Sequence, residues 1–300
     1  MDAWIFLSIL AAAFQTLRFM LQKSLSMGTL STGGATFARF FYAAPCAFVL
    51  AAGYLAYHGT ALPALGPRFW AYALTGGLTQ ILATWCVVAL FSHRNFAVGI
   101  TFKKTEVIQT ALVGFVLLGD RVSLPGLMAI TVGLVGVLFL SDTPGLEGGV
   151  LRRMVNRAAG LGLVSGALFA VSAVTYRGAT LEVGSDDAFL RAAVSVSAVT
   201  LSQTLGMAAW LAWREPGQLS RVWAARGRAV WMGVASLGGS ISWFTAFTLQ
   251  NAAYVFAVGQ VEVIFSLMAS VLFFKESVSR RELAGIGLLT ASILLLVLLG

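Results

Sequence analysis

Two stretches of sequence decide the fold: KKTEVIQTALVGFVLLGDRVS at residues 103–123 and GQVEVIFSLMASVLFFKESVS at residues 259–279. Each carries one glutamate, Glu106 or Glu262, inside an apolar run, and the two lie 156 residues apart (262 − 106). At this offset 7 of 29 positions are identical between residues 95–123 and 251–279. A carboxylate inside a membrane helix is costly and marks a candidate functional site. Two at matching places predict a duplicated membrane protein with a central polar site. The alternative is that each glutamate pairs with a base and only holds helices together.

The composition predicts an all-α integral membrane protein. Hydrophobic residues make up 58% of the chain and charged residues 11%, against about 25% charged in soluble domains. About ten apolar segments have membrane-spanning length, and no connection is long enough to form a soluble domain. The predicted spans are residues 3–26, 33–57, 69–92, 95–118, 122–140, 158–181, 187–213, 228–250, 252–274 and 281–299.

Several function classes lack their sequence signals. The first apolar segment has no basic lead-in or cleavage site, so we expect a retained span and no signal peptide. Cys46 and Cys86 fall inside predicted spans, where a disulfide framework is not expected. We find no nucleotide-binding loop and no metal-ligand spacing. We therefore expect no cofactor and no enzyme activity, and transport driven by a gradient or by exchange.

The net charge of +8 follows the membrane topology, so nucleic acid is not an expected partner. Twelve basic residues fall in the connections after odd-numbered spans and three, Arg68, Arg121 and Arg177, on the other side. By the positive-inside rule both termini are periplasmic. The twelve are Lys23, Arg94, Arg152, Arg153, Arg157, Arg214, Arg221, Arg226, Arg228, Lys275, Arg280 and Arg281.

The repeat divides the chain into two halves. Residues 1–142 form spans one to five, residues 143–157 a basic loop between the repeats, and residues 158–300 spans six to ten. Since each half has an odd number of spans, the halves are inverted relative to each other, around a central cavity. Each glutamate lies eleven residues beyond an asparagine, Asn95 or Asn251, which is about 16 Å into a core about 30 Å thick.

The two glutamates differ in their neighbours. Lys103 is three residues before Glu106, so these two are expected to pair. Lys104 points about 100° away on the same helix and needs another partner or a route to the surface. Glu262 has no charged residue within a turn of its own helix. Unless a base from another helix reaches it, burial favours its neutral form, which makes Glu262 the candidate proton-coupling site.

Basic residues exceed acids inside the predicted spans. The spans contain five basic residues and two glutamates; the basic residues are Arg18, Arg39, Lys103, Lys104 and Arg191. A buried positive cluster without compensating acids attracts an anionic group. Arg39 and Arg191 are the candidate carboxylate or phosphate contacts. Further candidates for hydrogen bonds or aromatic walls are Trp85, Trp243, Tyr254 and Gln260.

The chain resembles the EamA branch of the drug/metabolite transporter superfamily. The likeness rests on Lys104–Val107 with Gly119–Ser123, and on Gln260–Val263 with Lys275–Ser279. These segments resemble a pattern of a mid-helix glutamate followed fourteen residues later by an acidic residue that opens the last span. That pattern commonly has proline after the glutamate, whereas Val107 and Val263 stand here, which leaves the expected kink open. The resemblance implies a secondary carrier that works by alternating access.

We therefore predict a secondary transporter of small organic metabolites in a bacterial-type inner membrane. The expected substrates are amino acids or other carboxylate- or phosphate-bearing solutes, with protons as a candidate coupling ion, and the expected partners are membrane lipids. A monomer and a homodimer both remain open. The alternatives are efflux of cationic drugs, with Glu106 or Glu262 attracting the cation, and a non-transporting receptor or structural membrane protein.

Overall fold

The structure is a computed structural model that describes residues 2–26, 28, 30–90, 103–140, 157–265, 268 and 280–299. The regular elements among these residues are helices and no strands. They are α1 (Ala3–Ser26), α2 (Thr32–His58), α3 (Pro67–Leu90), α5 (Glu106–Leu118), α6 (Leu124–Leu140), α8 (Arg157–Leu181), α9 (Ala188–Arg214), α10 (Gln218–Ala224), α11 (Arg226–Leu249), α12 (Ala252–Gly259) and α14 (Arg280–Leu299).

Six of these helices, α1, α2, α3, α8, α9 and α11, are long and apolar enough to cross a membrane. The apolar sequence over 106–118, 124–137, 252–265 and 283–298 forms shorter helices. Many large apolar side chains face outward, as lipid contact requires. Examples with more than half of their surface exposed are Phe48, Leu74, Leu112, Met128, Leu201 and Leu298.

The helix ends follow from local sequence. Ser31, Asp187 and Asn251 each stand just before a helix and accept a backbone N–H from its first turn, which satisfies a donor that has no partner within the helix. At the other end, Gly59 and Gly119 close α2 and α5 with φ angles of 61° and 69°, a left-handed conformation that glycine adopts without strain.

The predicted spans agree with the described helices except in the fourth and ninth. Instead of a continuous helix over 95–118, the structure has α5 starting at Glu106, after a turn at Lys104 and Thr105. Similarly, α12 ends at Gly259, and helix resumes only at Glu262. The short α10 was not predicted. Residues 91–102, 141–156 and 269–279, which include Asn95, most of the basic loop and Glu276, lie outside the described residues.

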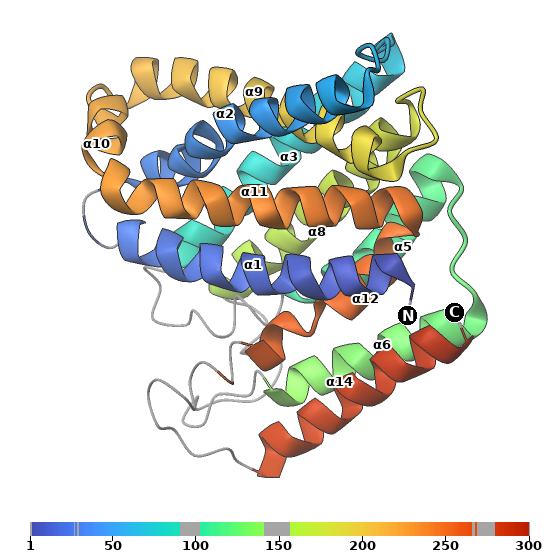
Figure 1. The fold of residues 1–300 in the computed structure, drawn as a ribbon. Coiled ribbons are helices and arrows are strands. Elements are labelled where there is room, and N and C mark those ends of the chain that lie inside the picture. Colours follow the sequence, from blue (N-terminus) through green and yellow to red (C-terminus); the bar gives the residue numbers. More distant parts are fainter. Residues whose placement is uncertain are drawn as a thin grey trace.

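The helices pack in pairs that join the two halves of the chain (Figure 1). Helix α3 packs against α8, α1 against α11, α2 against α9, α6 against α14, and α5 against α12. The core between α3, α8, α11 and α12 contains buried Phe69, Tyr176, Phe244 and Val255. Residues from both halves therefore meet in the centre of the bundle.

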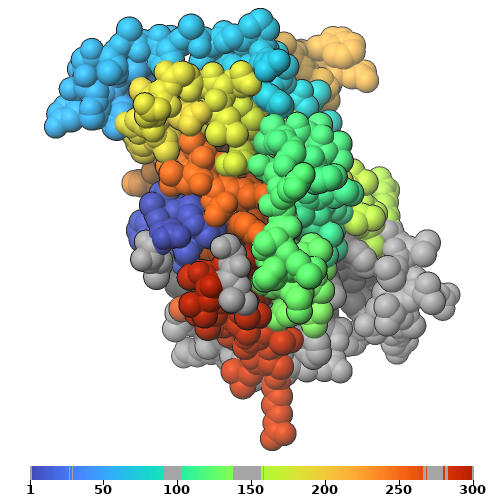
Figure 2. Space-filling model, turned by 90° about the vertical axis from the view of Figure 1, so that its right-hand side faces the viewer, coloured from blue at the N-terminus to red at the C-terminus, as the bar shows by residue number. Residues whose placement is uncertain are grey.

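Both ends of the described chain lie at the same end of the bundle (Figure 1). The connections after α2, α5 and α8 lie there too. Figure 2 looks onto this end, with the N-terminal residues in blue, the turn after α5 in green, the connection after α8 in yellow and the connection after α2 in cyan. Helix α10 lies at the opposite end of the bundle (Figure 1).

Candidate functional site

Glu106 begins α5 beside a break in the helical path. Lys103 is helical, Lys104 and Thr105 form a turn, and the buried Glu106 carboxylate accepts a bond of 2.8 Å from Lys103 Nζ. Gly166 of α8 packs directly against this turn, because a Cβ there would lie 2.9 Å from the Lys103 carbonyl oxygen. The predicted pairing of Lys103 with Glu106 is confirmed. The second carboxylate oxygen, Glu106 Oε2, is buried without a hydrogen-bond partner among the described residues.

Glu262 follows the corresponding break in the second half. The turn at Gln260 and Val261 uses short i→i+3 bonds, from Val261 N to Val258 O at 3.1 Å and from Val263 N to Gln260 O at 2.9 Å. Interrupted helices of this kind occur at the central sites of transporters. The missing proline left in question whether the helix bends after each glutamate. The structure has a turn before each glutamate, at residues 104–105 and 260–261.

A base from the other half reaches Glu262. Lys104 Nζ lies 2.8 Å from Glu262 Oε2, and Gln15 Nε2 donates to the same oxygen at 2.9 Å. The missing partner of Lys104 is therefore this carboxylate. A base from another helix thus reaches Glu262, which is the condition under which burial was not expected to favour its neutral form. An adjacent ammonium favours the ionised carboxylate, so the reason for choosing Glu262 as the proton site is lost.

Two buried arginines have no carboxylate partner among the described residues. Arg39 donates one hydrogen bond, to Thr84 Oγ1 at 3.0 Å, and its guanidinium lies 4.9 Å from the ring centre of Phe40. Arg18 donates to Gln22 Oε1 at 3.1 Å and lies over the ring of Phe19. Both arginines are at least 95% buried. Because a guanidinium stays protonated in proteins, both remain positively charged.

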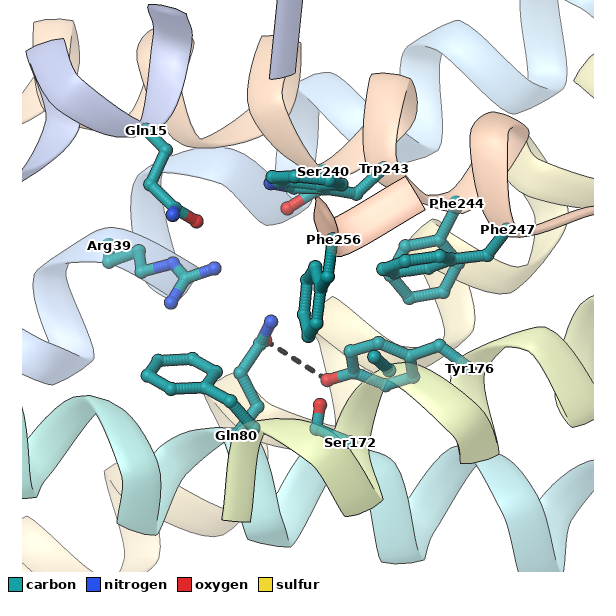
Figure 3. Close-up of a pocket in the computed structure, with 12 residues that line it drawn as sticks. Gln15, Arg39, Gln80, Ser172, Tyr176, Ser240, Trp243, Phe244, Phe247 and Phe256 are labelled. Atoms are coloured by element: carbon teal, nitrogen blue, oxygen red, sulfur yellow. Dashed lines mark hydrogen bonds between the residues drawn. The ribbon is translucent and has the colours of Figure 1, made fainter. Parts of the chain in front are cut away.

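The guanidinium of Arg39 points into a narrow cavity at the centre of the bundle (Figure 3). The empty space among its lining atoms is about 390 Å³, part of which is open to solvent. Its polar lining consists of Gln15, Arg39, Gln80, Ser172, Tyr176 and Ser240. The hydroxyl of Tyr176 donates to Gln80 Oε1 at 3.0 Å, and Gln203 Nε2 donates to the same oxygen at 3.0 Å.

An aromatic wall faces Arg39 across this cavity (Figure 3). Trp243 stacks on Phe247 with ring centres 5.7 Å apart, and Phe256 meets both rings edge-on at 5.3 and 5.5 Å. Tyr176 and Phe244 extend the wall with ring centres 4.3 Å apart. The cavity therefore offers one cationic side and one flat apolar side, which suits a ligand with an anionic group and an apolar body.

A second cavity, with about 260 Å³ of empty space among its lining atoms, shares lining residues with the first and is lined by three of the four ion-paired side chains. Lys103, Glu106, Gly259 and Glu262 line it. Gln15, Phe169, Trp243 and Phe256 line both cavities. The two glutamates of the repeat, far apart in sequence, thus meet at one site beside Arg39.

The remaining predicted residues separate into those near the cavities and those away from them. Trp243 lines both cavities, and the buried Gln260 lines a small hollow beside Lys104. Arg191 lies away from the cavities and donates to the carbonyls of Thr180 and Leu181 at the end of α8, a common role of arginine at a helix C-terminus.

Two aromatic candidates also pack elsewhere. Trp85 meets Trp210 edge-on with ring centres 4.8 Å apart. The hydroxyl of Tyr254 accepts from the backbone N–H of Ser123 at 2.9 Å. Both are explained by packing between helices. Sequence reasoning missed Gln15, Phe169 and Phe256 as lining residues. Gln15 had a usable signal, since it lies three residues before Arg18 on the same predicted helix face.

The two ends of the α2–α9 pair are tied by polar contacts. Tyr54 Oη donates to Asp187 Oδ2 at 2.5 Å at one end. This bond, together with the backbone N–H groups of Phe189 and Leu190, holds the pKa of the Asp187 carboxyl below its usual value of 3.8. At the other end Ser31 Oγ donates to Glu215 Oε2.

Comparison with known proteins agrees with a transporter fold. Residues 156–298 match the family described as EamA-like transporter family. None of the curated proteins matches the chain. A solved structure described as "Crystal structure of protein" aligns with a TM-score of 0.67 and 15% identity over 97% of this chain and 99% of that chain, which indicates a shared fold alone. The second half of the chain is therefore similar to the EamA-like transporter family, as the sequence resemblance predicted.

Proposed function

We propose that the protein is a secondary carrier of small organic anions that works by alternating access through the central cavity. Carboxylate- or phosphate-bearing metabolites, amino acids among them, are its substrates. The proposal rests on the guanidinium of Arg39. It is buried, aimed into a cavity and without a carboxylate partner among the described residues. An unpaired buried charge is costly, and an anionic ligand offsets that cost when it binds.

The helix pairing supports ten spans arranged as a five-plus-five inverted repeat. If α1, α2, α3, α5 and α6 correspond to α8, α9, α11, α12 and α14, the contact of α1 with α11 becomes that of α8 with α3. The contacts of α2 with α9, α5 with α12 and α6 with α14 each map onto themselves. Such two-fold pairing is what inverted repeats produce around a substrate site.

The tied ends of α2 and α9 support alternating access. Under the same correspondence, Ser31 before α2 matches Asp187 before α9, and each contacts the last turns of the other helix or the residue after it. One tie joins α2 to α9 at each end of this pair. Opening one tie while the other holds would expose the cavity to one side at a time.

Cation efflux is the runner-up, and the ion pairs count against it. Both glutamates bond to lysines at 2.8 Å. A cationic drug would have to displace a lysine ammonium from its carboxylate, in a site that also contains Arg39.

For orientation we propose a bacterial-type inner membrane with periplasmic termini. Lys23 and Arg214 lie in the last turns of odd-numbered spans, and Arg221, Arg226 and Arg228 lie between α9 and the start of α11 or in its first turn. Cytoplasmic connections and the span ends beside them are enriched in such residues. A phosphatase fused after Gly300 should be active and a fluorescent protein there dark. A fluorescent fusion would reverse the orientation and leave the carrier proposal intact.

Ligand-dependent stabilisation tests the proposed substrate class. Thermal unfolding of the purified protein should shift upward with an organic carboxylate or phosphate from a metabolite panel, because a ligand of the native state stabilises it. Arg39→Gln should abolish that shift. Arg191→Gln is the matched control, since it removes contacts of a half-buried arginine away from the cavities and should keep the shift. A shift produced only by lipophilic cations would overturn the proposal.

A further inference from the structure

The charged groups around the two cavities do not balance. Two lysine–glutamate pairs neutralise each other at 2.8 Å. Arg18 and Arg39 remain without a carboxylate partner among the described residues, so the described cluster carries two surplus positive charges. All six residues are more than nine-tenths buried.

The two surplus charges act on the same region. Arg18 lies one turn after Gln15 on α1, and Gln15 lines both cavities. At that position Arg18 repels Arg39 electrostatically and attracts Glu262. Arg39 itself lines the larger cavity, while Arg18 is not among the lining residues. An anionic ligand bound to Arg39 would therefore also be attracted electrostatically by Arg18, because charges in the protein interior are poorly screened.

We infer that the substrate is an organic dianion, with Arg39 binding one anionic group directly and Arg18 favouring the second charge. The inference rests on the proposed function and narrows its substrate class. A guanidinium binds carboxylate or phosphate through paired N–H donors, and Arg39 uses one donor for Thr84. A dianion would neutralise the described cluster, whereas a monoanion would leave one buried charge uncompensated.

The aromatic wall adds a requirement on the rest of the ligand. Trp243, Phe247 and Phe256 present flat apolar surface opposite Arg39. A planar or apolar body fits this wall, since aromatic rings stack favourably on one another. A phosphate monoester and a dicarboxylate both supply the dianion.

Matched ligands on the purified protein test the inference. Phenyl phosphate and phthalate are the dianions, and methyl phenyl phosphate and benzoate are the monoanions of similar shape. At pH 7.5 the second ionisation of a phosphate monoester is largely complete, because its pKa is about 6. We expect calorimetric affinities at least about tenfold higher for one or both dianions than for the matched monoanion, since one additional charge–charge interaction in a poorly screened interior is worth about that factor.

Variants at Arg18 separate this inference from the proposed function. Arg18→Gln should bring the dianion and monoanion affinities within about twofold while keeping monoanion binding through Arg39, and Arg18→Lys should restore the preference. If the wild-type protein binds monoanions as tightly as dianions, or Arg18→Gln keeps the preference, the inference fails and the anion carrier stands. If none of the anions binds, the proposed function fails as well. Should Arg18→Gln not fold, the wild-type series alone decides.

Discussion

The ion pair between Lys104 and Glu262 joins the two halves of the chain through buried charges. Its Nζ–Oε2 distance is 2.8 Å, and the side chains are 4% and 11% exposed. Pairs of this kind specify which surfaces meet, while their net stability depends on desolvation. At this site the pair brings the turn before α5 together with the turn after α12.

Replacing one residue of this pair should lower the free energy of unfolding more than replacing both residues. Glu262→Leu and Lys104→Met should each lower stability, by about 3–5 kcal/mol, because the remaining charge stays buried without its partner. The double variant should cost clearly less than the sum of the two single changes. Apparent Tm values of the four proteins in detergent form the cycle. Additive losses would show that the two charges are not coupled.

Asp187 provides a pH-dependent contribution outside the spanning helices. Its carboxyl caps α9 and accepts from Tyr54, so Asp187→Ala should lower stability by about 1 kcal/mol near neutrality. Because the pKa in the folded protein lies below 3.8, this stabilisation is present above the unfolded pKa and is lost as pH falls through the folded one.

The difference in Tm between wild type and Asp187→Ala should thus hold from about pH 7 to about pH 5 and fade in stronger acid. Asp187→Asn is the control, since asparagine caps helices as well as aspartate but does not titrate. An undiminished difference in acid would mean that the charge of Asp187 plays no part.

Residue spacing predicted some of these contacts and not others. The pairing of Lys103 with Glu106 follows from a spacing of three on one helix. The pairing of Lys104 with Glu262 depends on how α5 and α12 pack, which a single sequence does not encode locally. Arg191 shows the opposite error, because a basic residue inside an apolar segment can cap a neighbouring helix end as well as bind a ligand.

At the level of helices, the interruptions before Glu106 and Glu262 are the main departure from the predicted spans. Hydropathy predicts continuous helices because most of the uncharged residues around each break are apolar or small. Proline, the usual sequence mark of a kink, is absent at both places. The breaks are compatible instead with close packing, of Gly166 on the Lys103 carbonyl and of Gly259 on Trp243.

Gly259 therefore offers a test of the second break. A Cβ at Gly259 would overlap the indole ring of Trp243, so Gly259→Ala should cost about 1–3 kcal/mol by overpacking and weaken ligand binding by moving the wall. Gly206→Ala in α9 is the matched control, because nothing lies within 4 Å of its Cβ position and alanine favours helix by up to about 1 kcal/mol. Equal Tm values and affinities for both variants would contradict the packing argument.

For the whole molecule, polar residues inside apolar segments predicted the position of the central site better than they predicted which side chains line it. The recurrence of glutamate at a fixed offset located the centre of the bundle, because a buried carboxylate persists only where partners satisfy it. The aromatic wall was largely missed. Phenylalanine occurs 21 times in the chain, and no periodicity separates lipid-facing rings from those of a cavity.

Uptake into proteoliposomes tests whether the cavity carries organic anions across the membrane. Vesicles containing the purified protein, preloaded with unlabelled phthalate or phenyl phosphate, would be offered the labelled compound. Uptake by exchange should be well above that of empty vesicles, should be lost in Arg39→Gln and should persist in Arg191→Gln. The opposite result would contradict the proposed anion carrier. In that case the vesicles would take up a lipophilic cation such as tetraphenylphosphonium, but neither these anions nor any anion that stabilises the protein.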